Sequence, residues 1–294
     1  MQPIFDAELT IRRKRRALAA AMPGASFLMD RAAEDLADRL ATVERRFDHA
    51  AALFSLTPAA ADVLAASGKV AKVTRVETDS AFLAGGDGLV SPLDRMPFEP
   101  ESIDLAVSLL SFQEANDIPG LLIQIRRALR PDGLVLAAFA GSGTLTELRE
   151  SLLAAETEIS GGASPRVIPF TDIRDAGALL QRAGFALPVA DVETITVRYE
   201  SMFGLLRDLR AMGATNALLD RSRKPATRRL FARAAEIYAE RFSDPDGRVR
   251  ATFALVWLSG WAPHASQQKP LQPGSGQVSL TKVLEEKSGK PKPD

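Results

Sequence analysis

The stretch from Phe98 to Ala140 decides the fold, and it reads F-E-P-E-S-I-D-L-A-V-S-L-L-S-F-Q-E-A-N-D-I-P-G-L-L-I-Q-I-R-R-A-L-R-P-D-G-L-V-L-A-A-F-A. Its apolar run at 103–110 is too short for a typical helix and fits a strand buried on both faces. Residues 121–129 carry leucine and isoleucine at helical spacing. The turn residues Pro131-Asp132-Gly133 follow, and then a second apolar run at 134–139. Strand, helix, turn and strand form a βαβ unit, which predicts a parallel sheet covered by helices.

Motifs within and after this stretch resemble one known family. N-D-I-P-G followed by Q-I-R-R-A-L-R-P-D-G-L-V-L resembles the middle of class I S-adenosylmethionine (SAM) methyltransferases. Later motifs are similar to the subfamily that includes the mitochondrial complex I assembly factor that hydroxylates an arginine. These motifs are L-R-E-S-L-x-x-A-E-T-E at 148–158, G-G-x-S-P-R-x-x-P-F-T at 161–171, R-A-G-F at 182–185, M-F-x-L-L-x-D-L-R-x-M-G at 202–213 and G-W-x-x-H-x-S-Q at 260–267.

The resemblance and the periodicity together predict an α/β, Rossmann-like class I methyltransferase fold with helices on both faces of a mainly parallel twisted sheet. We expect N-terminal helices in residues 1–45 and a methyltransferase-like domain in 46–265. Within that domain, 201–245 should be a helical insertion before the last strand. The last two strands, near 189–199 and 251–260, should form the far edge of the sheet, one of them antiparallel. Residues 266–294 are rich in Gln, Lys, Pro, Gly and Ser, which predicts a largely disordered tail.

Composition excludes several classes of function. The net charge is zero, so no overall field attracts nucleic acid. The chain has no cysteine and two histidines, which argues against disulfides and a metal centre. No apolar stretch is long enough to span a membrane. The basic run at 12–16 reads as one face of the first helix rather than as a transit peptide, and we expect a bacterial cytosolic protein without a leader.

The turn after the first strand departs from the family. The resemblance implies SAM as cofactor, held where a glycine-rich turn lets the backbone approach the ligand. Here the turn is Phe54-Ser55-Leu56-Thr57-Pro58, without glycine. Side chains at these places crowd the amino-acid part of SAM. We therefore expect Phe54, Leu56 and Pro58 to close the crevice partly and SAM binding to be impaired.

Three residues are candidates for cofactor binding by resemblance. Glu77 ends the second strand, where the family's acid accepts hydrogen bonds from the ribose hydroxyls; the alternative is a solvated acid at a strand end. Ser55 lies in the cofactor turn, and Ser108, near the end of the fourth strand, could line the pocket or pack between strand and helix. Pro92 replaces the acid that many relatives place near the adenine, and Asp87 or Asp94 could substitute or could be surface acids.

The loop after the fourth strand is family-like only in part. Gln113 and Glu114 stand where relatives usually have histidine and tryptophan. Asn116 and Asp117 are retained, and their alternative role is to cap the following helix. No catalytic residue and no metal ligand can be assigned from these patterns.

Residues in the region of the later motifs are candidates for binding a substrate or partner. Arginine and aromatic side chains often anchor protein interfaces, and this region contains Arg166, Arg198, Trp261 and His264. Each could instead serve packing or turn formation. The sequence leaves three hypotheses: an active SAM-dependent methyltransferase or hydroxylase of a protein substrate, a pseudoenzyme that binds or assembles a protein client such as a respiratory-complex subunit, and a binder of another small molecule. The missing glycines favour the second, while the oligomeric state cannot be inferred.

Overall fold

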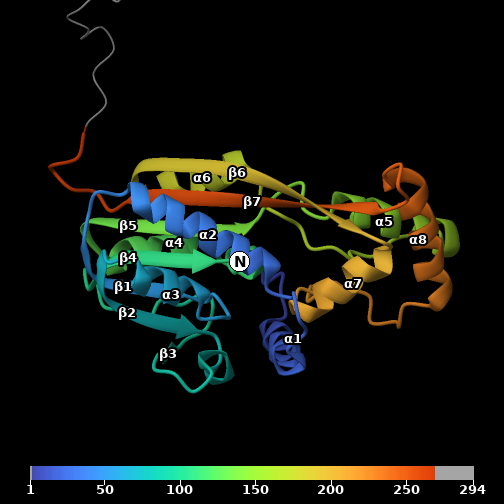
Figure 1. The fold of residues 1–294 in the computed structure, drawn as a ribbon, viewed down its shortest axis with the longest axis horizontal. Helices are drawn as coiled ribbons and strands as arrows, with labels where there is room; N and C mark the ends of the chain where they lie inside the picture. Colours follow the sequence, from blue (N-terminus) through green and yellow to red (C-terminus); the bar gives the residue numbers. More distant parts are fainter. Residues whose placement is uncertain (1, 269–294) are drawn as a thin grey trace, which may run out of the picture. The chain divides into compact units, whose positions relative to one another are not determined.

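One seven-stranded sheet organises the computed structural model, which describes residues 2–268 (Figure 1). Its strands are β1 (Phe47–Leu53), β2 (Val70–Glu77), β3 (Leu89–Val90), β4 (Ile103–Leu109), β5 (Leu129–Ala140), β6 (Ala186–Tyr199) and β7 (Val249–Trp261). Their order is β3-β2-β1-β4-β5-β7-β6. β1 to β5 pair in parallel, and β7 runs antiparallel between β5 and β6. The predicted class I fold, including its far edge, is confirmed.

Helices cover both faces of the sheet because neighbouring strand residues point to opposite sides. Ala51 and Leu53 belong to one apolar cluster with α4 (Ile118–Ala128) and α6 (Ile173–Arg182). Ala50 and Ala52 belong to a second cluster with α2 (Phe27–Thr42) and α3 (Ala59–Ala66). These buried alanines leave room for helices to approach the sheet closely.

A third apolar cluster lies where β6 and β7 extend beyond the other strands (Figure 1). It combines α5 (Thr146–Ser160), α7 (Met202–Ala211) and α8 (Arg228–Phe242) with the start of β7. The predicted helical insertion is therefore confirmed as α7 and α8. The N-terminal helix α1 (Ala7–Ala20) contacts α7, which places it beside this cluster.

Some local boundaries differ from the sequence prediction. The Pro131-Asp132-Gly133 turn lies inside β5 as an irregularity, because the β4–β5 register shifts between Ile103 and Leu105. Asp132 takes the left-handed conformation there, with φ of 66°. The two-residue β3 was not predicted, and short one-turn helices follow β2 (Ser80–Leu83, η1) and β4 (Phe112–Glu114, η2).

Residues up to Pro263 form one compact unit, and His264 begins a separate one. The predicted disordered tail falls almost entirely outside the described residues. Across 2–268, no helix is long and apolar enough to cross a membrane. The same part of the chain contains no group of three or more His, Cys, Asp or Glu side chains that could hold a metal.

Candidate functional site

A cavity of about 660 Å³ opens at the carboxyl ends of three neighbouring strands. Leu56 and Thr57 follow β1, Leu110 follows β4, and Ala140 ends β5; all four line the cavity. Helices α1, α2, α5 and α7 contribute to the remaining walls, together with β7 and the segments 166–170 and 212–217. Open α/β sheets bind ligands at this edge, where the strand order reverses. The fold therefore presents a site large enough for a small ligand or a few side chains.

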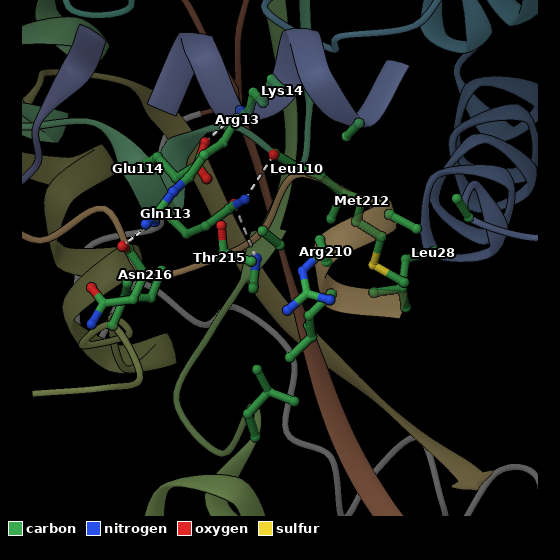
Figure 2. Close-up of a pocket in the computed structure, with 18 of the residues that line it drawn as sticks. Arg13, Lys14, Leu28, Leu110, Gln113, Glu114, Arg210, Met212, Thr215 and Asn216 are labelled. Carbon is green, nitrogen blue, oxygen red and sulfur yellow. Dashed lines mark hydrogen bonds and ion pairs between the residues drawn. The ribbon is translucent and has the colours of Figure 1, made fainter. Parts of the chain in front are cut away.

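The cavity combines apolar walls with an ion pair at its inner end. Lys14 of α1 pairs with Glu114 of η2, and the two side chains are 13% and 11% exposed. Figure 2 shows Lys14 above Glu114 and Gln113 beside it. The Gln113 amide nitrogen donates to the carbonyl of Leu110 at 2.7 Å. The two positions that differ from the family's histidine and tryptophan are therefore occupied by groups that the chain satisfies itself.

Arg13, also on α1, adds positive charge to the cavity. Its guanidinium donates to the backbone carbonyl of Asn216 (Figure 2). Burial and the neighbouring charges of Arg221 and Arg16 lower its pKa. A cationic group in such surroundings favours an anionic partner.

Asn116 and Asp117 hold structure rather than facing the cavity. The Asn116 side-chain oxygen accepts the backbone N–H groups of Ile4 and Phe5, both at 2.8 Å. Asp117 accepts the N–H of Gly120 at 2.8 Å, so it caps α4. The capping alternative is thus confirmed for Asp117, and Asn116 fixes the segment that leads into α1.

The turn after β1 keeps a glycine-like backbone without glycine. Phe54 and Leu56 both take the left-handed conformation, with φ of 54° and 62°. The Phe54 ring is 3% exposed and belongs to the core between the sheet and α4. Ser55 is 2% exposed, and its hydroxyl oxygen accepts the N–H of Leu109 at 3.2 Å. Ser55 therefore joins β1 to β4.

Glu77 is buried and already bonded from within the chain. Glu77 is 1% exposed. One oxygen of its carboxylate accepts from the Arg75 guanidinium at 3.1 Å, and the other accepts the backbone N–H of Leu56 at 3.2 Å. Burial raises the pKa of Glu77 to about 7, against the lowering effect of Arg75 and the Leu56 N–H. The alternative of a solvated acid is wrong, because this carboxyl group has almost no contact with solvent.

The residues present do not fit the nucleoside of SAM. In related α/β folds, an acid in this region accepts hydrogen bonds from ribose hydroxyls, but here each Glu77 oxygen already accepts from Arg75 or the Leu56 N–H, and the side chain is 2% exposed, which leaves a ribose no access. The nearby cavity is nevertheless open. Our expectation that Phe54, Leu56 and Pro58 close the crevice is wrong at the β4–β5 end, because Leu56 lines the cavity without filling it. Phe54 is buried in the core and Pro58 is exposed.

The other cofactor candidates are internal as well. Ser108 is 1% exposed, and its hydroxyl shares a 2.7 Å hydrogen bond with that of Ser111. Asp94 accepts the N–H groups of Asn116 and Asp117 at 3.1 and 3.2 Å, so it supports the loop after β4. None of these contacts assigns a ligand role.

Within the compact unit, the predicted partner-binding residues Arg166, Arg198 and Trp261 do not form one surface. Arg166 lines the cavity and forms a two-point ion pair with Glu156, at 3.0 and 2.6 Å. Arg198 pairs with Asp244 and Asp246 after α8. Trp261 lies at the opposite end of β7, beside Leu134, with the Arg45 guanidinium 5.3 Å from its ring centroid. His264 shares a 2.7 Å hydrogen bond with Ser266 in its own unit.

Sequence reasoning missed Arg75 and Lys14. Arg75 stands two residues before Glu77, so strand periodicity places both side chains on one face of β2, and this signal was available. Lys14 is 100 residues from Glu114, and only the folded chain brings the two together.

Comparisons with known proteins agree with the fold. A family model described as a methyltransferase domain matches residues 55–137. Relatives named "Arginine-hydroxylase NDUFAF5, mitochondrial" include one from Dictyostelium discoideum, 44% identical over 63% of this chain and 42% of that protein. The human protein of this name is 35% identical over 94% of this chain and 82% of its own length. Among solved structures, the YcgJ protein of Bacillus subtilis has a TM-score of 0.52 at 14% identity, covering 79% of this chain and 99% of that one.

Proposed function

Because this chain belongs to the arginine-hydroxylase NDUFAF5 family of class I methyltransferase-fold proteins, we propose that it is a pseudoenzyme that binds and helps to assemble a protein client. The client implied by the family resemblance is a subunit of respiratory complex I. One observation carries the proposal: Arg75 and Leu56 satisfy Glu77 internally, while a cavity of about 660 Å³ stays open beside them.

The cavity walls indicate what kind of client segment would enter. Leu148 and Phe253 are among the apolar residues that line it, and Arg13 and Arg166 bring positive charge. Arg166 is already paired with Glu156, whereas Arg13 donates to a neutral backbone carbonyl in a net positive environment. We propose that the client presents apolar side chains and an acidic group. Arg198, Trp261 and His264 are not among the residues that line this cavity. Any contact that they make with the client would lie elsewhere on the protein surface.

A second candidate function is a SAM-dependent enzyme that modifies a protein. Two observations favour it: the backbone at Phe54 and Leu56 has the conformation that glycine takes, and the relatives are named arginine-hydroxylases. The two functions differ in their dependence on Glu77. An enzyme that holds a nucleoside through this carboxylate loses activity when it becomes an amide, whereas a client-binding protein tolerates the change.

Complementation tests the proposal. The cells are of a type that contains complex I, and their own copy of this protein has been removed. They receive the wild type, Ala140→Trp or Glu77→Gln, and assembled complex I is measured on native gels. Ala140 lines the cavity, so the tryptophan should occupy it and abolish rescue, while Glu77→Gln should rescue fully.

The matched control for the cavity variant is Ala41→Trp, an exposed alanine of α2 away from the cavity. It should rescue like the wild type. Rescue by Ala140→Trp together with failure of Glu77→Gln would replace the client-binding proposal with the enzyme.

A further inference from the structure

Arg75 lies at the β1–β2 end of the crevice, where a nucleoside ligand would meet Glu77. Its guanidinium takes the place of that ligand. Its guanidinium donates to a Glu77 oxygen at 3.1 Å, to the carbonyl of Phe82 at 2.9 Å and to that of Leu83 at 3.5 Å. The Arg75 and Glu77 side chains are 13% and 2% exposed. A buried carboxylate needs hydrogen-bond donors or a proton, so the ionised form of Glu77 depends on a donor such as Arg75.

A guanidinium and the two hydroxyls of a ribose offer a carboxylate the same kind of contact. Both present N–H or O–H donors close together, and a carboxylate accepts such a pair readily. The two compete here because the Glu77 side chain is 2% exposed, which leaves no room for a ribose beside the guanidinium. The internal donor has the advantage that it comes with the folded chain, so it does not carry the entropic cost of association that an incoming ligand carries.

We propose that Arg75, together with the Leu56 side chain, is the specificity determinant that excludes nucleoside ligands from this crevice. The inference rests on the proposed function, in which the chain works without such a ligand. Leu56 lines the cavity in the turn after β1. An adenosine ligand that reached Glu77 would have to lie against the backbone of this turn. Removing both side chains should expose Glu77 to a ribose.

An alternative role for Arg75 is purely structural, as a clamp on η1 through the carbonyls of Phe82 and Leu83. The two roles predict different results. A clamp predicts that removing Arg75 only lowers stability. A built-in ligand predicts that its removal also creates affinity for nucleosides, a gain of function that loss of a clamp cannot produce.

The test measures binding of S-adenosylhomocysteine and of adenosine to the full chain by calorimetry. We compare the wild type, Leu56→Gly, Arg75→Ala and the double variant Arg75→Ala/Leu56→Gly, with circular dichroism to verify folding. The double variant should bind both probes at least about tenfold more tightly than the wild type, and Arg75→Ala alone should gain less. Adding Glu77→Gln to the double variant should remove the gain, since an amide is a weaker acceptor for two hydroxyls.

If Arg75→Ala/Leu56→Gly does not fold, Arg75→Gln/Leu56→Gly keeps a polar side chain at position 75 and answers the same question. A folded double variant without gain overturns the inference while the proposed function stands. A gain that survives Glu77→Gln overturns it as well. Tight nucleoside binding by the wild type overturns both the inference and the proposed function.

Discussion

One end of the crevice is filled by side chains of the protein itself, whereas the other end is an open cavity. At the β1–β2 end, Glu77 is bonded by Arg75 and by the Leu56 N–H, and Phe54 is buried in the core. At the β4–β5 end, a cavity of about 660 Å³ lies under α1. The closed end is built from residues 54–83, which comprise the turn after β1, α3, β2 and η1, whereas the open end is lined by segments from most of the chain. In our proposal, a few local residues exclude nucleosides and leave the open end intact.

The largest effect is expected from Phe54→Gly, which tests whether packing holds the closed end. Loss of a buried phenylalanine side chain costs about 3–5 kcal/mol. Glycine recovers about 1 kcal/mol of left-handed strain at this position, where φ is 54°. Urea denaturation should therefore show a net loss of about 2–4 kcal/mol. Stability equal to that of the wild type would mean that the ring does not contribute to closing this end.

The pH dependence of stability tests the burial of Glu77. Its pKa is about 7 in the folded chain against an ordinary value of 4.5, so the folded state binds this proton more tightly than the unfolded state does. The resulting stability is fully present below pH 4.5 and is lost as the pH rises to about 7. The loss amounts to about 3 kcal/mol at most.

Glu77→Gln lacks this titration and serves as the comparison. The difference in unfolding free energy between Glu77→Gln and the wild type should shift in favour of the variant between pH 4.5 and 7 and stay level above. Parallel stability curves over that interval would contradict the raised pKa of Glu77 and would mean that Arg75 and the Leu56 N–H offset the effect of burial.

At the open end, the Lys14–Glu114 pair can be broken from one side. Lys14→Met leaves the 11% exposed Glu114 side chain without its partner charge, which should cost about 1–3 kcal/mol. The double variant Lys14→Met/Glu114→Gln removes both charges and should recover most of that loss in thermal or urea denaturation. A double variant no more stable than Lys14→Met would indicate that the cavity-facing charges are not coupled.

Leu56→Gly should have the smallest effect on stability. The half-buried leucine side chain loses some apolar contact, and glycine relieves the strain of a residue with φ of 62°. The two effects are of opposite sign and about 1 kcal/mol each, so urea denaturation should place the variant within about 1 kcal/mol of the wild type. A large loss would mean that Leu56, like Phe54, packs the closed end.

The fold was predictable because its signals are local. The apolar runs and the turn between Phe98 and Ala140 define a βαβ unit, and the later motifs identify the family. β3 escaped prediction because two paired residues, Leu89 and Val90, are too few for a periodic pattern.

The site was predictable only in part, because its side chains contact residues that no sequence pattern brings together. The missing glycines did not change the backbone conformation of the turn, since Phe54 and Leu56 take the left-handed conformation. The sequence could not show that Phe54 turns into the core while Leu56 borders a cavity, since that depends on side-chain direction in a left-handed turn. The sequence also grouped Arg166, Arg198 and Trp261 as candidates for partner binding, although Arg198 and Trp261 lie at opposite ends of the β6–β7 pair.

A calorimetric titration of the wild-type chain with SAM tests the central claim most directly, because it asks whether the β1–β2 end admits a nucleoside. With Glu77 bonded to Arg75 and Leu56, we predict no saturable binding up to about 1 mM ligand, which corresponds to less than about 4 kcal/mol of binding free energy. Saturable binding with a Kd in the micromolar range, lost in Glu77→Gln, would contradict the account and establish the chain as a SAM-binding protein.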